Sequence, residues 1–153
     1  MSADPSLFTL RTLRAGEHAE VSALWSRSKQ RAYPWLAVAQ THTPAEDFVY
    51  FAGTVCTRCE VWLALRGERI VGLLALEGSH IDQLYVEPSE QRGGVGSRLL
   101  EQAKSLKPAG LSLFTFQRNA RARAFYEARG FRAVRFGVSA APESEPDVRY
   151  EWP

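Results

Sequence analysis

Apolar and polar residues alternate along some segments of this chain and recur at helical spacing along others. Alternating segments rich in β-branched and aromatic residues predict strands, whereas apolar residues three and four positions apart predict helices. The predicted strands cover residues 8–14, 80–86, 111–116, 131–139 and 147–152, with two more inside 59–76 that a turn at Arg66-Gly67-Glu68 joins. The predicted helices cover residues 16–31, 94–107 and 119–129, with a fourth that begins at Thr43.

Residues at the helix ends support these boundaries. Thr43 can cap its helix, Pro44 suits the first turn, and Glu46 can complete a capping box. Asn119 is placed to cap another helix, and Gly130 follows that helix where a left-handed residue often stands. The helix that begins at Thr43 is predicted to have one apolar face, formed by Phe48, Phe51, Ala52 and Val55.

The order of these elements predicts the fold class. A chain of 153 residues suits one compact domain, and no repeat or linker divides it, so residues 1–153 are predicted to form a single domain. The alternation of strands and helices predicts an α/β (mixed α+β) fold, with a mostly antiparallel, twisted sheet of about seven strands and about four helices. The two strands that flank helix 94–107 can lie parallel, joined by a right-handed crossover.

Composition excludes several classes of protein. The chain is 45% apolar and 24% charged, and its formal net charge of +2 is too small to favour nucleic acid or a membrane as a partner. The arginines of segment 118–123 do not form one stripe along a helix, so we interpret them as a solvated face. No apolar run approaches the length of a membrane span, and the N-terminal segment does not resemble a secretory signal. A cytoplasmic protein is therefore predicted.

The two cysteines do not predict a metal site. Cys56 and Cys59 form one C-x-x-C pair, and no second pair of ligands follows, although a structural zinc usually has four ligands. The pair is predicted to end a helix and to open a strand, unlike a thioredoxin-like redox pair. We interpret both as reduced thiols, with a redox or metal-binding role as the less favoured alternative.

A glycine-rich segment, residues 89–98 (S-E-Q-R-G-G-V-G-S-R), connects strand 80–86 to the following helix. Such a turn presents unpaired backbone N–H groups to an anion, and the helix dipole favours negative charge there. Arg92 and Arg98 add positive charge, and the Ser97 hydroxyl can donate a hydrogen bond. A phosphate site is therefore predicted, with a purely structural turn as the alternative.

Two common phosphate motifs fit this segment poorly. The P-loop of nucleotide-binding proteins requires a lysine after its last glycine, and none follows here. The dinucleotide fingerprint G-x-G-x-x-G fits at Gly94 and Gly96 but has Leu99 in place of the third glycine.

Two segments together resemble the GNAT (Gcn5-related) N-acetyltransferase family. Residues 91–96, Q-R-G-G-V-G, fit the family motif Q/R-x-x-G-x-G/A, and residues 119–126 followed by Gly130-Phe131 resemble its N-x-x-A-x-x-F-Y…G-F signature. Both motifs lie in the family's order and separation, and together they cover about residues 80–135. The resemblance implies the GNAT acyl-CoA N-acyltransferase fold and an acyltransferase that uses acetyl-CoA as co-substrate.

The resemblance also implies where the donor binds. The pyrophosphate would lie on the backbone N–H groups of residues 91–96. The pantetheine arm would pair with strand 80–86, which splays away from strand 111–116 to admit it, and Asn119 would hydrogen-bond that arm. The implied donor-binding residues are Leu84, Tyr85, Val86, Gln91, Arg92, Gly93, Gly94, Val95, Gly96, Ser97, Arg98, Asn119 and Phe125.

Tyr126 is the general acid that the resemblance implies. A phenol with a pKa near 10 is a neutral proton donor at pH 7, and its mismatch with a thiolate costs only about 2 kcal/mol. Without the resemblance, Tyr126 would be interpreted as a core aromatic. For the general base, His80 and Asp82 are predicted to share one face of their strand, and His80 falls where some members of the family carry a catalytic glutamate. Glu77 and ordered water are the alternatives.

The acceptor is predicted to be the primary amine of a small molecule or a peptide. Tyr33 and Trp35 lie where the family walls its acceptor pocket, although simple packing of a long loop is the favoured interpretation of this segment. The identity of the amine is not predicted, because variable loops build such pockets. A coenzyme A-binding module without turnover is the alternative from another class, and the presence of Tyr126 argues against it. Formation of a homodimer through the C-terminal strands is left open.

Overall fold

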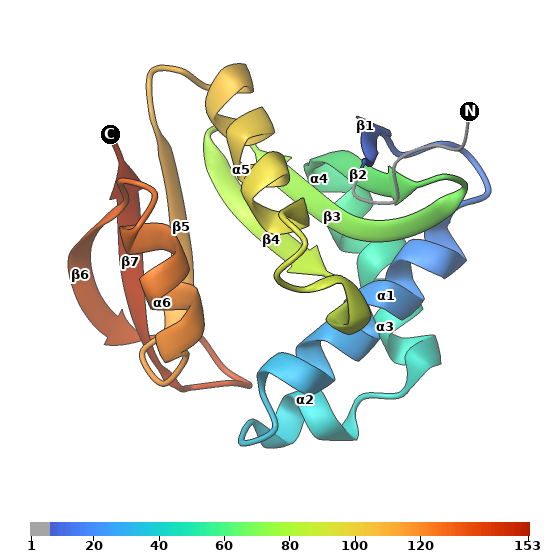
Figure 1. Cartoon of the computed structure of the whole chain (residues 1–153). Coiled ribbons are helices and arrows are strands. Elements are labelled where there is room, and N and C mark those ends of the chain that lie inside the picture. The colour runs from blue at the N-terminus through green and yellow to red at the C-terminus, as the bar shows by residue number, and fades with distance from the viewer. Residues whose placement is uncertain (1–6) are drawn as a thin grey trace.

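A seven-stranded sheet with the order β1-β2-β3-β4-β5-β7-β6 forms the centre of the computed structural model, which describes residues 7–153 (Figure 1). Neighbouring strands are antiparallel except β4 and β5, which are parallel. The strands are β1 (Thr9–Thr12), β2 (Glu60–Arg66), β3 (Arg69–Glu77), β4 (His80–Val86), β5 (Leu111–Phe116), β6 (Arg132–Val138) and β7 (Pro146–Trp152). The predicted mixed fold with a mostly antiparallel sheet is confirmed.

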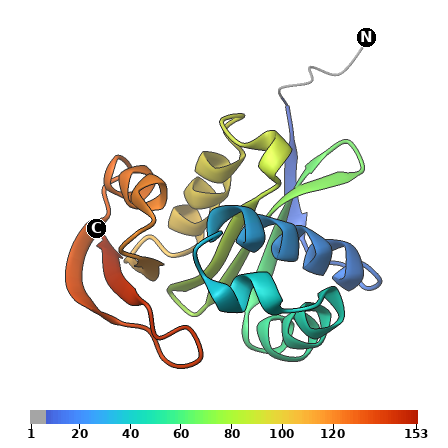
Figure 2. The same cartoon turned by 90° about the horizontal axis from the view of Figure 1, so that it is seen from below.

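Helices cover both faces of the sheet (Figures 1 and 2). The helix α1 and the π-helix η1 pack on one face, with α3 against α1, and α5 and α6 pack on the other face. The α-helices are α1 (His18–Ala32), α2 (Ala37–Thr41), α3 (Pro44–Tyr50), α4 (Cys56–Arg58), α5 (Val95–Leu106) and α6 (Ala120–Glu127). The π-helix η1 (Phe51–Val55) lies between α3 and α4, and the 3-10 turn η2 (Pro88–Glu90) lies between β4 and α5. None of these helices is long and apolar enough to cross a membrane.

Each face of the sheet has its own apolar core. Leu24 and Phe51 pack against Leu73 on the face of α1, and Leu99 packs with Leu74 on the face of α5. Because successive strand residues point to opposite faces, Leu73 and Leu74 enter different cores. The strand β3 is consequently buried on both sides, which explains why its sequence is continuously apolar.

The helix that begins at Thr43 departs from its predicted shape. The capping box is confirmed, since Thr43 Oγ1 accepts from the Glu46 N–H at 3.1 Å and the Glu46 carboxylate accepts from the Thr43 N–H at 3.1 Å. After α3, however, the chain continues as the π-helix η1, whose hydrogen-bond spacing does not keep a 3.6-residue period. The predicted single apolar face is therefore wrong at Phe48, which is 40% exposed, while Phe51 and Val55 are buried.

The strands β4 and β5 separate soon after they begin. They pair at only two positions, His80 with Ser112 and Ile81 with Leu113, which confirms the predicted parallel arrangement and the predicted splay. On its other edge, β4 pairs with β3 along its length, but the register shifts so that Asp82 is an extra residue between Ile81 and Gln83. This bulge lies where the gap between β4 and β5 opens.

The strand β6 forms one edge of the sheet. All seven of its residues are exposed, and they include the apolar Val134, Phe136 and Val138. Formation of a homodimer through these C-terminal strands stays a prediction.

Candidate active site

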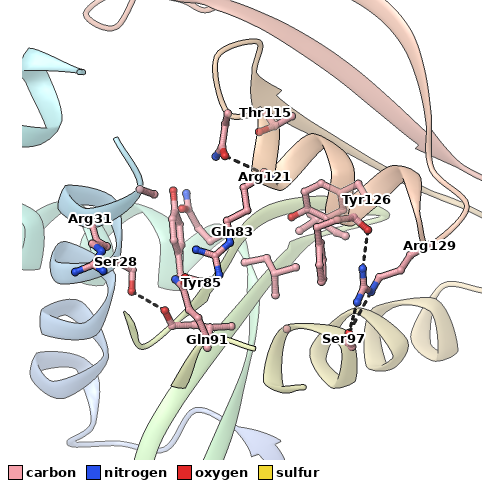
Figure 3. A pocket seen from close by; sticks show the side chains of 18 of the residues that line it. Ser28, Arg31, Gln83, Tyr85, Gln91, Ser97, Thr115, Arg121, Tyr126 and Arg129 are labelled. Atoms are coloured by element: carbon pink, nitrogen blue, oxygen red, sulfur yellow. Dashed lines mark hydrogen bonds between the residues drawn. The ribbon is translucent and has the colours of Figure 1, made fainter. Parts of the chain in front are cut away.

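A cavity of about 660 Å³ occupies the gap between β4 and β5. Its walls come from β4, the loop that follows it, the first turn of α5, the strand β5, the helix α6 and the C-terminal turns of α1 (Figure 3). The splay of the two strands therefore creates a channel that passes between the two layers of helices.

The first turn of α5 forms one end of the cavity. Gly94, which precedes the helix, has a φ of +84°, a left-handed conformation that glycine adopts without strain. No side chain of the described residues caps this helix. The N–H of Arg98 is bonded to the carbonyl of Gly94 at 3.0 Å, so the N–H groups of the three residues 95–97 have no intrahelical acceptor. This end of the cavity therefore presents free N–H donors, which suit an anion.

Gly96 keeps the space beside the first turn of α5 open. A Cβ atom added there would lie 3.5 Å from the Phe125 ring and 3.5 Å from Val86. These are ordinary contact distances, so the absence of a side chain leaves space for a ligand rather than preventing a clash.

Arginines surround the cavity. Arg31, Arg92, Arg121 and Arg129 all line it, and none of them forms an ion pair with a carboxylate among residues 7–153. Figure 3 shows Arg31 and Arg121 on opposite walls. The uncompensated positive charge matches a ligand with several negative charges.

Three tyrosines line the middle of the cavity. Tyr126 on α6 is 8% exposed, and its ring contacts Phe125 and Phe131 edge to face. Its hydroxyl makes no hydrogen bond within the described part of the chain, and burial raises the pKa of Tyr126 far above its ordinary value. On the facing walls, the hydroxyls of Tyr33 and Tyr85 lie 3.1 Å apart. Burial also raises the pKa of both of these tyrosines, so all three remain neutral phenols at pH 7.

A chain of hydrogen bonds fixes the carboxylate at the bulge. The buried Trp25 indole donates to Gln83 Oε1 at 2.9 Å, and Gln83 Nε2 donates to Asp82 Oδ2 at 2.9 Å. Asp82 and Gln83 both line the cavity. Because Asp82 Oδ2 is held in this way, its second oxygen remains available to a ligand or to water.

Related proteins place this architecture in a family. A family model of the acetyltransferase (GNAT) domain matches residues 57–133. Peptidyl-lysine N-acetyltransferase YjaB of Escherichia coli (strain K12) is 31% identical over 129 residues, 84% of this chain and 84% of the relative. The chain belongs to the GNAT family of N-acetyltransferases. It is an acyltransferase by this membership.

Solved structures agree with the GNAT assignment. The solution structure of apo YjaB from Escherichia coli has a TM-score of 0.79 and 26% identity, and the match covers 95% of this chain and 97% of that one. A putative streptothricin acetyltransferase of Bacillus anthracis str. Ames, solved with acetyl coenzyme A, has a TM-score of 0.56 and 25% identity over 62% of each chain.

The residues that the GNAT resemblance implied for the donor are only partly gathered at the cavity. It is lined by Leu84, Tyr85, Val86, Gln91, Arg92, Gly94, Gly96, Ser97, Asn119 and Phe125. Gly93, Val95 and Arg98 are absent from the described lining of the cavity. Val95 is buried in the core below α5, and Arg98 is exposed. The Gly93 N–H donates to the Glu90 carbonyl at 3.2 Å.

Asn119 both caps α6 and lies at the cavity. Its Oδ1 accepts from the Ala122 N–H at 3.1 Å and so caps α6, as predicted. The Asn119 side chain also lines the cavity. Its amide NH₂ group makes no hydrogen bond within residues 7–153 and is therefore available to a ligand.

The two predicted base candidates do not occupy equivalent positions. They were expected to share a strand face, but the bulge at Asp82 interrupts the alternation on which that expectation depends. Asp82 lines the cavity, whereas His80 is absent from its described lining. The His80 Nδ1 lies 2.8 Å from Ser112 Oγ, and burial lowers the pKa of His80. Glu77, the alternative, forms an exposed ion pair with Arg58 at 2.7 Å.

The predicted acceptor wall is also divided. Tyr33 lines the cavity, but Trp35 is absent from the described lining. Trp35 packs edge to face on Phe116, with its ring 5.2 Å from the Arg118 guanidinium. Trp35 also contacts the ring of Tyr33, with ring centroids 5.7 Å apart, and its role in acceptor binding stays a prediction.

Several site residues are not evident from the sequence. Trp25 has the spacing of a core residue, Gln83 carries no motif, and Arg129 ends the predicted helix 119–129 without any marked pattern. Their roles depend on contacts between segments far apart in the chain, 58 residues apart for Trp25 and Gln83. A buried indole, which needs a hydrogen-bond acceptor, was the one available signal.

Metal-ligating side chains are not clustered in the part of the chain that the structure describes. Within residues 7–153, no group of three or more histidine, cysteine, aspartate or glutamate side chains could hold an ion. Cys56 and Cys59 both carry free thiols.

Proposed function

We propose that this protein transfers the acetyl group of acetyl-CoA to a primary amine by direct attack of the amine on the thioester. The observation that carries this proposal is one continuous cavity with an anion site at the start of α5 and, farther along, the Tyr126 phenol and the Asp82 carboxylate.

The cavity suits the donor in three respects. Unpaired N–H groups of residues 95–97 and the surrounding arginines match its phosphates. Within residues 7–153, the edge of β4 that faces the gap has no partner strand beyond Ile81, so its backbone can pair with the amides of a pantetheine arm. The free amide of Asn119 can donate to the same arm.

The side chains support a balanced reaction. The amine nitrogen forms a bond to the thioester carbon, the carbon–sulfur bond breaks, and its electron pair leaves with the sulfur. Tyr126 supplies the proton that the thiolate takes up, and Asp82, directly or through water, takes the proton that the nitrogen loses. Burial of Tyr126 makes its phenol a weaker acid than an ordinary tyrosine, so the hydrogen bond to the leaving sulfur carries much of its effect.

A lysine side chain is the acceptor that these observations favour. The relatives from Escherichia coli and Salmonella typhimurium are named peptidyl-lysine N-acetyltransferases. In this chain, Asp82 forms no ion pair within residues 7–153 and lines the cavity, so its carboxylate can hold an ammonium group before that group loses a proton.

The test is acetyl transfer to defined amines, followed by thiol release and by mass spectrometry of the product. The amines are a peptide with one lysine and a blocked N-terminus, a peptide with a free N-terminus and no lysine, and spermidine. We expect thiol release with the lysine peptide and its loss in Tyr126→Phe, with Arg135→Gln, on the exposed strand β6, as a control. Coenzyme A binding without release on any amine would instead support a non-catalytic binding module.

A further inference from the structure

Arg129 joins the end of α6 to the first turn of α5. Its Nε and Nη2 both donate to Ser97 Oγ, at 3.1 and 2.7 Å, and its Nη1 donates to the Phe125 carbonyl at 2.9 Å. The guanidinium lies 3.9 Å from the centre of the Phe125 ring. Figure 3 shows this arrangement at the edge of the cavity. Four contacts therefore hold one side chain in a single position.

This arrangement determines what the Ser97 hydroxyl can do. A serine hydroxyl has two acceptor positions and one proton to donate. Arg129 fills both acceptor positions, so the proton of Ser97 is left to donate. Ser97 lines the cavity, and its own backbone N–H is one of the unpaired groups at the start of α5. Its hydroxyl thus adds a donor to a set of groups that are already all donors.

The charge of Arg129 is not neutralised nearby. No carboxylate among residues 7–153 pairs with it, and the side chain is partly buried against Phe125. Partial burial reduces the screening of its charge by solvent. By contrast, Arg98, which lies on the first turn of α5 itself, is exposed and absent from the described lining of the cavity.

We propose that Arg129 makes this site selective for a thiol donor that carries phosphate groups, by positioning the Ser97 hydroxyl and by placing a fixed positive charge beside the start of α5. The inference rests on the proposed function in one respect, that the donor is acetyl-CoA. It assigns the selectivity for the phosphates to a residue outside the glycine-rich segment.

The experiment compares binding of coenzyme A and of pantetheine, which has the same thiol arm without phosphates, by calorimetry. In Arg129→Gln we expect coenzyme A to bind about tenfold more weakly, because a charge-assisted interaction is lost, and pantetheine to bind as in the wild type. Arg129→Lys keeps the charge but not the paired donors, so an intermediate loss is expected. Arg135→Gln makes the same change of charge on the exposed strand β6 and serves as the control.

Ser97→Ala keeps the test decisive if Arg129→Gln proves unstable in thermal melting. This variant should also weaken the binding of coenzyme A without affecting the binding of pantetheine. The double variant should bind coenzyme A no more weakly than Arg129→Gln alone, because the two residues act as a unit. If the binding of both ligands weakens equally, or if the binding of coenzyme A does not weaken, the inference is overturned and the proposed function stays intact. A wild-type protein that binds no coenzyme A would overturn both.

Discussion

The indole N–H of Trp25, on α1, donates a 2.9 Å hydrogen bond to Oε1 of Gln83, on β4. This bond orients the Gln83 amide so that its NH₂ group points to Asp82, which it reaches at 2.9 Å. A buried residue of the α1 core thus determines the position of a carboxylate at the bulge of β4.

Loss of the hydrogen bond between Trp25 and Gln83 should slow the reaction without weakening the binding of coenzyme A. In Trp25→Phe we expect kcat to fall several-fold, because Asp82 is no longer held, while coenzyme A binds with unchanged affinity. The lost hydrogen bond should also lower the free energy of unfolding by about 1 kcal/mol or more. Steady-state kinetics and calorimetry measure both effects. Trp62→Phe is the matched control, since its indole bonds only to the exposed Glu60; an equal fall in kcat there would contradict the prediction.

Removal of the Tyr126 hydroxyl should affect catalysis alone. The hydroxyl has no hydrogen-bond partner within residues 7–153, so Tyr126→Phe leaves no buried group unsatisfied and should melt within a few degrees of the wild type. We expect kcat to fall about 100-fold, with coenzyme A binding retained. Because burial raises the pKa of Tyr126, the wild-type rate should show no loss from tyrosine ionisation up to about pH 10. A tyrosine-dependent fall near pH 8 would be inconsistent with this site.

Asp82 and His80 should differ in their effect on the rate. Asp82→Asn removes a carboxylate that lines the cavity, and we expect kcat at pH 7 to fall at least tenfold. His80→Gln changes a residue that is absent from the described lining, so a fall of less than threefold is expected. Kinetics of both variants with one acceptor provide the test. The reverse order of effects would identify His80 as the base.

His80 should make the protein more sensitive to mild acid. Burial lowers the pKa of the folded His80 below 6.5, so the unfolded chain binds the proton more readily than the folded one. The stability that depends on neutral His80 is therefore complete above about pH 7 and is lost as the pH falls through 6.5 toward the folded pKa. Melting temperatures at pH 8 and pH 5 should differ more for the wild type than for His80→Gln. A parallel pH dependence of the two proteins would exclude this linkage.

Local sequence patterns were sufficient to predict much of the fold. The strands β4 and β5 begin and end at the residues that the alternation indicated, and the caps at Thr43 and Asn119 form as expected. These features depend on neighbouring residues and on backbone hydrogen bonding, which sequence patterns record directly.

The arrangement within the site was less predictable. The bulge at Asp82 depends on how β3 pairs with β4, and it changes which of two candidate bases lines the cavity. The contact between Arg129 and Ser97 joins residues 32 positions apart and requires two helices to be packed already. No periodic pattern encodes such contacts, because each depends on the final distance between elements.

The short pairing between β4 and β5 has a consequence for amide hydrogen exchange. The backbone N–H groups of β4 that point away from β3, beyond Ile81, have no partner strand among the described residues to protect them. They should exchange with solvent much faster than those of β3, although both strands lie in the middle of the sheet. A bound donor arm would slow the exchange of these groups. The exchange rate of these β4 amides would therefore report the fraction of the enzyme that has a donor bound.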